Sequence, residues 1–290
     1  MIWYVLIFMA AIGCAANFAL TKVYQLNQGN SQETGIVFNF LVGIVGFLIY
    51  FGICGFKISI TPFSLILAIL LAVFIGLYTI IGFKIMSIGS IAVYTVFLML
   101  GGMILPYFYG VIFLGEGVTL TKIIALLLMT AAIILQRDVS NNKGKAVFYL
   151  LCVLVFIING AVSIVSKMHQ IDLGYKTVSE NEFVALKNAA RAVMFGGMLP
   201  FIKKGKWTML SIKPKMYIVI ALTGLFSNTA YLLQLICAAH LPATVQFPIT
   251  TGGTIIFTAL AGVACFGEKL EKRQVAGLII CLGATILFVI

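Results

Sequence analysis

The stretch LGEGVTLTKIIALLLMTAAIIL, residues 114–135, occurs a second time in this chain as FGEKLEKRQVAGLIICLGATIL, residues 266–287. An offset of 152 residues aligns the two copies without a gap and brings Glu116 onto Glu268. Each copy is a short Gly-Glu turn followed by an almost uncharged segment with the length of a helix. A long apolar chain that repeats itself in this way is typical of membrane transporters built from two halves.

The composition supports a membrane location. The chain has 290 residues, of which 62% are hydrophobic and 9% are charged. Soluble domains carry about 25% charged residues, so this chain cannot cover a folded surface with polar groups, and lipid must cover most of it. The net charge of +11 does not indicate nucleic acid, because Lys and Arg lie in short loops between apolar segments. There they orient the chain and contact anionic lipid headgroups. We therefore expect a multi-pass protein of the cell membrane.

The apolar segments predict the architecture. A helix needs about 20 apolar residues to span a bilayer, and ten segments qualify. They are residues 2–26, 36–56, 63–86, 90–113, 119–137, 144–169, 179–202, 214–238, 242–266 and 272–290. The polar break near mid-chain divides them into a first repeat, 1–138, a linker, 139–145, and a second repeat, 146–290.

The repeat extends beyond the opening stretch. Spans four and five match spans nine and ten at the offset of 152, and span one matches span six at an offset of 145, where Lys22 falls on Lys167. Because five spans is an odd number, the two copies must cross the membrane in opposite directions. The sequence thus predicts an all-α membrane protein of ten transmembrane helices, arranged as two inverted five-helix repeats that provide alternating access.

Several motifs together resemble a known family. They are AANFALTK (15–22), FKIMSIGSIAVYT (83–95) and the Gly-Glu turn in both copies. In this order they resemble the drug/metabolite transporter superfamily, and specifically its ten-helix EamA-type branch. Two departures concern local bends and substrate subclass: Ala15 and Ala16 replace a common Trp-Gly, and Pro106 lies one turn after the usual mid-span proline. The resemblance implies a transporter and not an enzyme.

Two basic residues inside span seven are the strongest candidates for substrate binding. Lys187 and Arg191 lie four residues apart and share one helix face, with Asn188 beside Lys187. Charge at membrane depth is costly, so this face must point to a cavity or a partner. It could bind a carboxylate or phosphate, which Arg grips with two hydrogen bonds. The alternatives are an internal ion pair with Glu180 or Glu182, and extension of Lys187 to the interface.

Other polar residues within apolar segments could complete such a site. We select Asn17, Tyr78, Tyr94, Asn159, Tyr231 and Gln246 as further substrate-binding candidates. Asn17 and Gln246 gain weight because spans one and nine resemble the cavity-lining helices of the family. Asn39, Ser163, Asn228, Gln234 and Thr250 also lie within apolar segments. Each of these groups could instead form a hydrogen bond between helices.

The acidic residues suggest no coupling role. None lies in the middle of a span, and residues 1–26 contain none. This disfavours the proton-for-cation exchange that small multidrug exporters of the superfamily perform through a glutamate in their first helix. Glu116 and Glu268 precede the fifth and tenth spans, and we expect them to be structural caps of helix N-termini.

The leading hypothesis is a secondary active transporter of a small organic metabolite, with an amino-acid-like or other anionic compound preferred. The alternatives are a multidrug or cationic-amine exporter and, from another class, a polytopic membrane enzyme or scaffold. We expect a coupling ion or an exchanged solute as a further partner, since no ATP-binding loop is present, and a monomer or homodimer. We expect no metal, no cofactor and no nucleic acid.

The orientation is predicted in two opposing ways. Lys and Arg are more numerous on the face of the mid-chain linker, which places that face in the cytoplasm and both termini outside. The family resemblance implies termini inside. Positions 31 and 142 share the linker face, so labelling of cysteines introduced there from outside would exclude a cytoplasmic linker.

Overall fold

The computed structural model describes residues 2–29, 31–88, 91–135, 146–171, 173–202, 212–267 and 269–289. Over these ranges the chain is helical and contains no strand. The elements are α1 (Ile2–Gln28), α2 (Gln32–Ile53), α3 (Pro62–Ile88), α4 (Ile91–Phe113), α5 (Leu120–Leu135), α6 (Ala146–Gln170), α7 (Glu180–Met198), the 3-10 helix η1 (Leu199–Phe201), α8 (Pro214–His240), α9 (Ala243–Phe266) and α10 (Lys272–Leu287).

The ten expected spans coincide with the ten α-helices of the described ranges. Seven of these helices are long and apolar enough to cross a membrane by length and composition alone. The helices α5 and α10 have 16 residues each and fall short in length. The helix α7 is long enough but carries Glu180, Glu182, Lys187 and Arg191, so it is less apolar than the other spans. The protein is an all-α membrane protein, and its described residues form ten α-helices that correspond to the expected spans.

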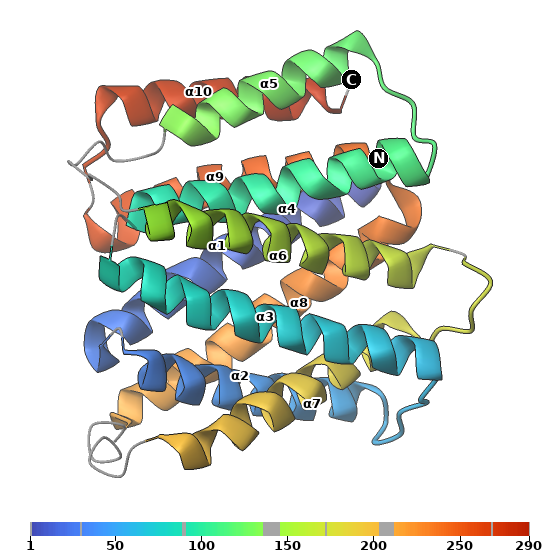
Figure 1. Ribbon diagram of the computed structural model, residues 1–290, viewed down its shortest axis with the longest axis vertical. Coiled ribbons are helices and arrows are strands. Elements are labelled where there is room, and N and C mark those ends of the chain that lie inside the picture. The colour runs from blue at the N-terminus through green and yellow to red at the C-terminus, as the bar shows by residue number, and fades with distance from the viewer. Residues whose placement is uncertain are drawn as a thin grey trace.

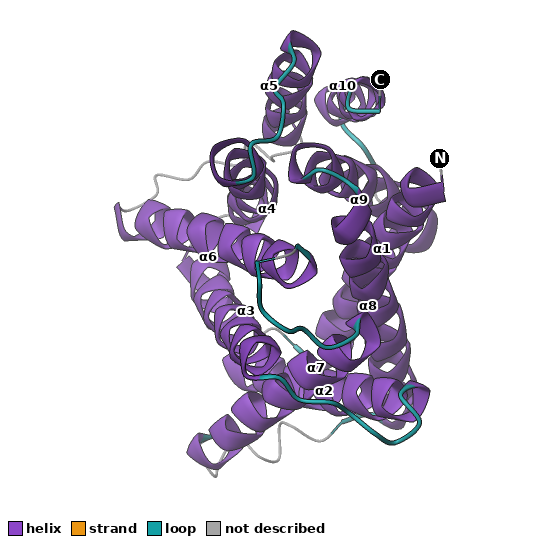
Figure 2. Cartoon of the chain, turned by 90° about the vertical axis from the view of Figure 1, so that its right-hand side faces the viewer, coloured by secondary structure: helices purple, strands orange, loops and turns teal. Residues whose placement is uncertain are grey.

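Eight of the helices form a closed ring. Neighbours are in contact in the order α4, α9, α1, α8, α2, α7, α3, α6 and back to α4 (Figure 2). The pair α5 and α10 lies outside this ring, next to α4 and α9. Side chains of α2, α7 and α8 therefore meet on the side of the ring that is remote from α5 and α10.

The packing has the symmetry of two inverted repeats. If each helix is replaced by its counterpart in the other half, the contact of α1 with α8 becomes that of α6 with α3. In the same way the contact of α4 with α6 becomes that of α9 with α1. All four contacts occur in the structure. The pairs α2·α7, α4·α9 and α5·α10 map onto themselves. Both termini lie toward the same end of the helices, on the right-hand side of Figure 1. An even number of spans with opposed halves produces this arrangement.

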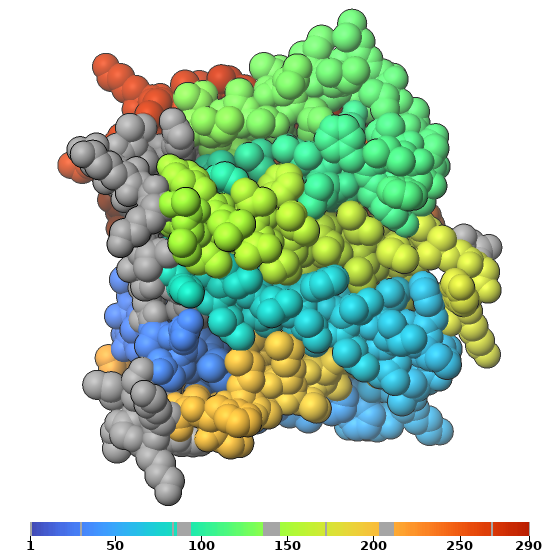
Figure 3. Space-filling model, viewed as in Figure 1, coloured from blue at the N-terminus to red at the C-terminus, as the bar shows by residue number. Residues whose placement is uncertain are grey.

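The outer surface is apolar, as contact with lipid requires. On the face shown in Figure 3, α5, α6, α3 and α7 lie one below the other. Each of them exposes large apolar side chains, for example Leu127, Leu150, Ile66 and Val193. In water such a surface would be an aggregation site, whereas in a bilayer it is the expected covering.

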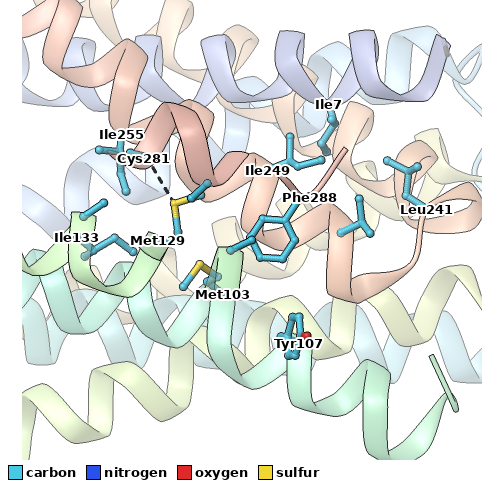
Figure 4. Packing of buried hydrophobic residues seen from close by; sticks show 14 of the residues in the cluster. Ile7, Met103, Tyr107, Met129, Ile133, Leu241, Ile249, Ile255, Cys281 and Phe288 are labelled. Carbon is cyan, nitrogen blue, oxygen red and sulfur yellow. Dashed lines mark hydrogen bonds between the residues drawn. The ribbon is translucent and has the colours of Figure 1, made fainter. Parts of the chain in front are cut away.

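The largest apolar core joins the outer helix pair to the ring. Met103 and Tyr107 of α4, Met129 of α5, Ile249 of α9 and Cys281 of α10 are among its buried members (Figure 4). This cluster holds α5 and α10 against α4 and α9. The predicted linker, 139–145, and part of the join at 83–95 lie outside the described residues, so the division into 1–138 and 146–290 stays a prediction.

Candidate functional site

The N-terminus of α7 is anchored by a capping box. The hydroxyl of Ser179 accepts a hydrogen bond from the backbone N–H of Glu182, and the Glu182 carboxylate accepts one from the backbone N–H of Ser179. The same carboxylate accepts a hydrogen bond of 2.7 Å from the backbone N–H of Ser59, between α2 and α3. The carboxylate of Glu182 thus binds backbone N–H groups at the start of the helix. It does not serve as a counter-ion for the basic residues further along α7.

Lys187 lies one turn beyond this cap and is buried, with 5% of its surface exposed. Its Nζ donates a 3.0 Å hydrogen bond to Oδ1 of Asn228 in α8. It also lies 3.9 Å from the centre of the Tyr231 ring, a cation–π contact. The hydroxyl of Tyr231 in turn shares a 2.9 Å hydrogen bond with Ser166 of α6. The lysine is held inside the protein, so extension to the interface is wrong.

A second amide completes the contact between α7 and α8. Nδ2 of Asn188 donates to Oδ1 of Asn228 at 2.8 Å and to the carbonyl of Val184 at 2.8 Å. The two amides fit together because α2 has a glycine opposite them: a Cβ on Gly46 would lie 2.7 Å from Oδ1 of Asn188. Oδ1 of Asn188 is buried and has no hydrogen-bond partner within the described residues.

Arg191 follows on the same face of α7. Its Nη2 donates a short hydrogen bond to Oδ1 of Asn39 in α2. The phenol of Tyr78 in α3 is near enough to interact with its charge. The Nε of Arg191 is buried and finds no acceptor among the described residues. Three ring helices, α2, α3 and α8, therefore contribute side chains around the two cations of α7.

The site has an excess of positive charge and of donors. Neither Lys187 nor Arg191 forms an ion pair with an acidic side chain of the described ranges. The internal ion pair considered for span seven is therefore absent from those ranges. An ammonium and a guanidinium together offer about eight N–H donors, and their side-chain acceptors here are neutral amide oxygens. A negative charge nearby stabilises positive charges that are removed from water, so the arrangement suits an anion.

The structure brings five of the predicted residues together, and the other four form none of the contacts described above. Lys187, Asn188, Arg191, Tyr231 and Tyr78 lie in or beside the cluster. Asn159 instead donates to the carbonyl of Leu98 and joins α6 to α4. Gln246 donates to the carbonyl of Gln234. Tyr94 packs close to Gly82, and Asn17 is half-buried in α1.

Asn39 and Asn228 bind the two cations of the candidate site but were not selected from the sequence. Both had been noted as polar residues within apolar segments, but nothing separated them from the others. One signal was present for Asn39. Ser31 caps α2 as Ser179 caps α7, and aligning the two serines places Asn39 on Lys187. The repeat thus puts a polar residue at corresponding depths of α2 and α7.

The capping role expected of Glu116 is confirmed, but for a different helix. Its carboxylate accepts hydrogen bonds from the backbone N–H groups of Ala243 and Thr244, at 2.7 and 2.8 Å. These residues begin α9, and not the helix α5 that follows Glu116 in the chain. The contact could not be foreseen from adjacency in sequence because it joins the two halves. Glu268 lies outside the described residues.

A family model decides the identity. The model described as the EamA-like transporter family matches residues 146–290, which is half of the chain and the whole of the predicted second repeat. The chain belongs to the EamA-like transporter family. The resemblance noted in the motifs is thereby confirmed, and membership makes the protein a membrane transporter and not an enzyme.

Structural comparison agrees with EamA membership at the level of the fold. A crystal structure of a protein that is 15% identical in sequence superposes with a TM-score of 0.74, covering 98% of this chain and 94% of that one. At this identity the likeness shows the fold alone. No curated protein sequence gives a significant match.

Proposed function

We propose that this EamA protein is a secondary active transporter of a small organic anion, which binds at Lys187 and Arg191. The cargo is a compound with a carboxylate or phosphate, such as an amino-acid-like metabolite. The two inverted halves expose the site alternately to each side of the membrane. An ion gradient or an exchanged solute supplies the driving force.

One observation carries this proposal: the buried Lys187 and the half-buried Arg191, on one face of α7, have neutral amides as their side-chain hydrogen-bond partners. An anion would supply the missing counter-charge. The unpartnered Nε of Arg191 offers a donor in addition to its outer nitrogens, and a guanidinium can bind a carboxylate or phosphate through two parallel hydrogen bonds. Membership of the family supports transport as such, and the charge of the site supports the class of cargo.

The test is a thermal-shift screen of the purified protein, followed by uptake into proteoliposomes. Amino acids, nucleotides, sugar phosphates and quaternary amines are the panels, because a ligand that binds the folded state raises the melting temperature. We expect shifts from anionic compounds. Arg191→Ala should abolish both the shift and the uptake of the anion while the protein elutes as a folded species.

The matched control is Arg273→Ala, which removes an arginine that is paired with Glu271 at the start of α10. It should leave binding and uptake unchanged. If quaternary amines raise the melting temperature and anions do not, the protein is a cationic-amine exporter and the proposal is wrong. Uptake of an anion that is unchanged in Arg191→Ala would also contradict it.

A further inference from the structure

The turn between α8 and α9 is held by charged side chains from two directions. The helix α8 ends at His240, and α9 begins at Ala243. Nζ of Lys167, in α6, donates to the carbonyls of Ala238 and Leu241 at 2.6 and 2.7 Å. A cation thus binds orphan carbonyls at the negative end of the α8 dipole.

The opposite charge binds the helix that follows. The carboxylate of Glu116 accepts from the first two backbone N–H groups of α9, at 2.7 and 2.8 Å. The carboxylate fits because α4 has a glycine beside it: a Cβ on Gly110 would lie 2.6 Å from Oε2 of Glu116 and 3.1 Å from Cβ of Ala243. Here α4 and α9 therefore approach closely, with the carboxylate between them.

These two contacts differ in what they connect. Lys167 and the α8–α9 turn both belong to the second half, so this contact moves with the half. Glu116 belongs to the first half and α9 to the second, so the Glu116 contact must break if the two halves separate at this end. The binding energy of these part-buried hydrogen bonds to a carboxylate makes that separation unfavourable.

The repeat supplies a counterpart for each residue. Glu116 corresponds to Glu268, Gly110 to Gly262 and Lys167 to Lys22. The positions that correspond to Ala243 and Thr244 are Ile91 and Ala92, at the start of α4. The Gly-Glu turn that reveals the repeat thus occurs in both halves, and in the first copy its carboxylate binds the N-terminus of a helix in the other half.

We propose that Glu116 is a gating residue: its carboxylate holds the two halves together at the α8–α9 end. Transport requires this contact to break when the halves separate at that end and to form again when they close. The inference rests on the proposed rocking of the halves but not on the identity of the cargo. It assigns to Glu116 a role in the conformational cycle, beyond capping a helix.

The experiment measures distances between spin labels at both ends of the protein in lipid nanodiscs, without substrate. The six native cysteines are first replaced by Ala or Ser. One pair of labels, at Val118 and Ala239, reports on the α4–α5 loop and the α8 terminus at the Glu116 end. A second pair, at Lys84 and Lys269, reports on the opposite end. All four positions are exposed.

In Glu116→Gln we expect a second population with a longer Val118–Ala239 distance. The ratio of the two populations should change by on the order of tenfold, because an amide oxygen accepts hydrogen bonds without the charge. The Lys84–Lys269 distance should shorten in the same population.

Two results would overturn the proposal. If Glu116→Gln only broadens the Val118–Ala239 distribution and leaves the far pair unchanged, Glu116 is a cap and no gate. If both distributions match those of the parent protein, the contact does not affect the equilibrium at all. The control is Glu271→Gln, which removes a carboxylate that caps α10 within its own half and should change neither distance. Because no ligand is used, failure of the anion hypothesis leaves this test intact.

Discussion

The Sγ of Cys281 lies 3.5 Å from the Sδ of Met129, and the two residues are 152 positions apart in the chain. The same offset relates the two copies of the Gly-Glu stretch. Residues that correspond in the two halves therefore touch one another in the interior of the α5–α10 pair (Figure 4). Two equivalent points can meet only on the axis that relates them, so the pseudo-two-fold axis of the inverted repeat passes between these sulfur atoms.

This contact predicts how the outer helix pair responds to truncation. Met129→Ala should lower the free energy of unfolding by about 2–5 kcal/mol, because the side chain is fully buried and its removal leaves a cavity. The affinity for the transported anion should not change, since α5 and α10 lie outside the ring. Thermal unfolding and ligand-induced shifts measure both. Leu127→Ala, on the exposed face of α5, is the control and should be close to neutral.

The close packing around Gly46 predicts that the polar cluster does not tolerate a larger side chain at this position. In Gly46→Ala the new methyl group would lie 2.7 Å from Oδ1 of Asn188 and still closer to Nδ2 of Asn228, so the amides must separate. We expect a destabilisation of about 1–3 kcal/mol, as for other overpacked sites, together with loss of anion binding. Gly52→Ala lies on the same helix with open space around it and should retain both properties. Normal anion binding in Gly46→Ala would show that the amide contact is dispensable.

Arg191→Lys separates charge from geometry. The positive charge remains, but the planar fork of the guanidinium is lost. The lysine ammonium is a single point charge that must serve both Asn39 and the ligand. We expect the affinity for a carboxylate to fall by on the order of tenfold, with little change in melting temperature. A titration followed by thermal shift or calorimetry measures this. Equal affinities in the two proteins would mean that Arg191 acts through its charge alone.

Close packing of α4 against α6 provides a prediction about stability. A Cβ on Gly101 would lie 2.7 Å from Cα of Phe156, so the two backbones could not keep their present distance. Gly101→Ala should therefore lower the melting temperature or prevent accumulation of folded protein. Gly283→Ala, in α10, meets no atom within 4 Å and should behave like the parent. A stable Gly101→Ala protein would show that α4 can shift along α6 without loss.

The sequence predicted the helices and the correspondence between the two halves because both follow from patterns along the chain. Apolar length identifies a span, and an odd number of spans in each repeat determines that the halves are inverted. The same reasoning located Lys187 and Arg191, because charge within a span is conspicuous. It could not choose Asn39 and Asn228 among several similar polar residues, since their importance depends on which helices α7 packs against.

The target of Glu116 could not be predicted for the same physical reason. A carboxylate before a helix normally binds the N–H groups of that helix, and the sequence shows the following helix but not the helix that approaches from the other half. Asn159 is a further case. Its amide donates to a backbone carbonyl of α4, and any helix that packed against α6 at this point could have supplied such a carbonyl. Long-range contacts of this kind require the three-dimensional arrangement.

The charge of α7 has a consequence for the biogenesis of the protein. Each cation at the centre of a span costs about 2.5–3.5 kcal/mol on the insertion scale, and α7 carries both Lys187 and Arg191 in 19 residues. We expect this helix to enter the bilayer poorly by itself. The amides that bind these cations come from α2, which is synthesised earlier, and from α8, which is synthesised later. Stable insertion of α7 must therefore wait until α8 has left the ribosome, and a chain truncated before α8 should leave α7 outside the membrane.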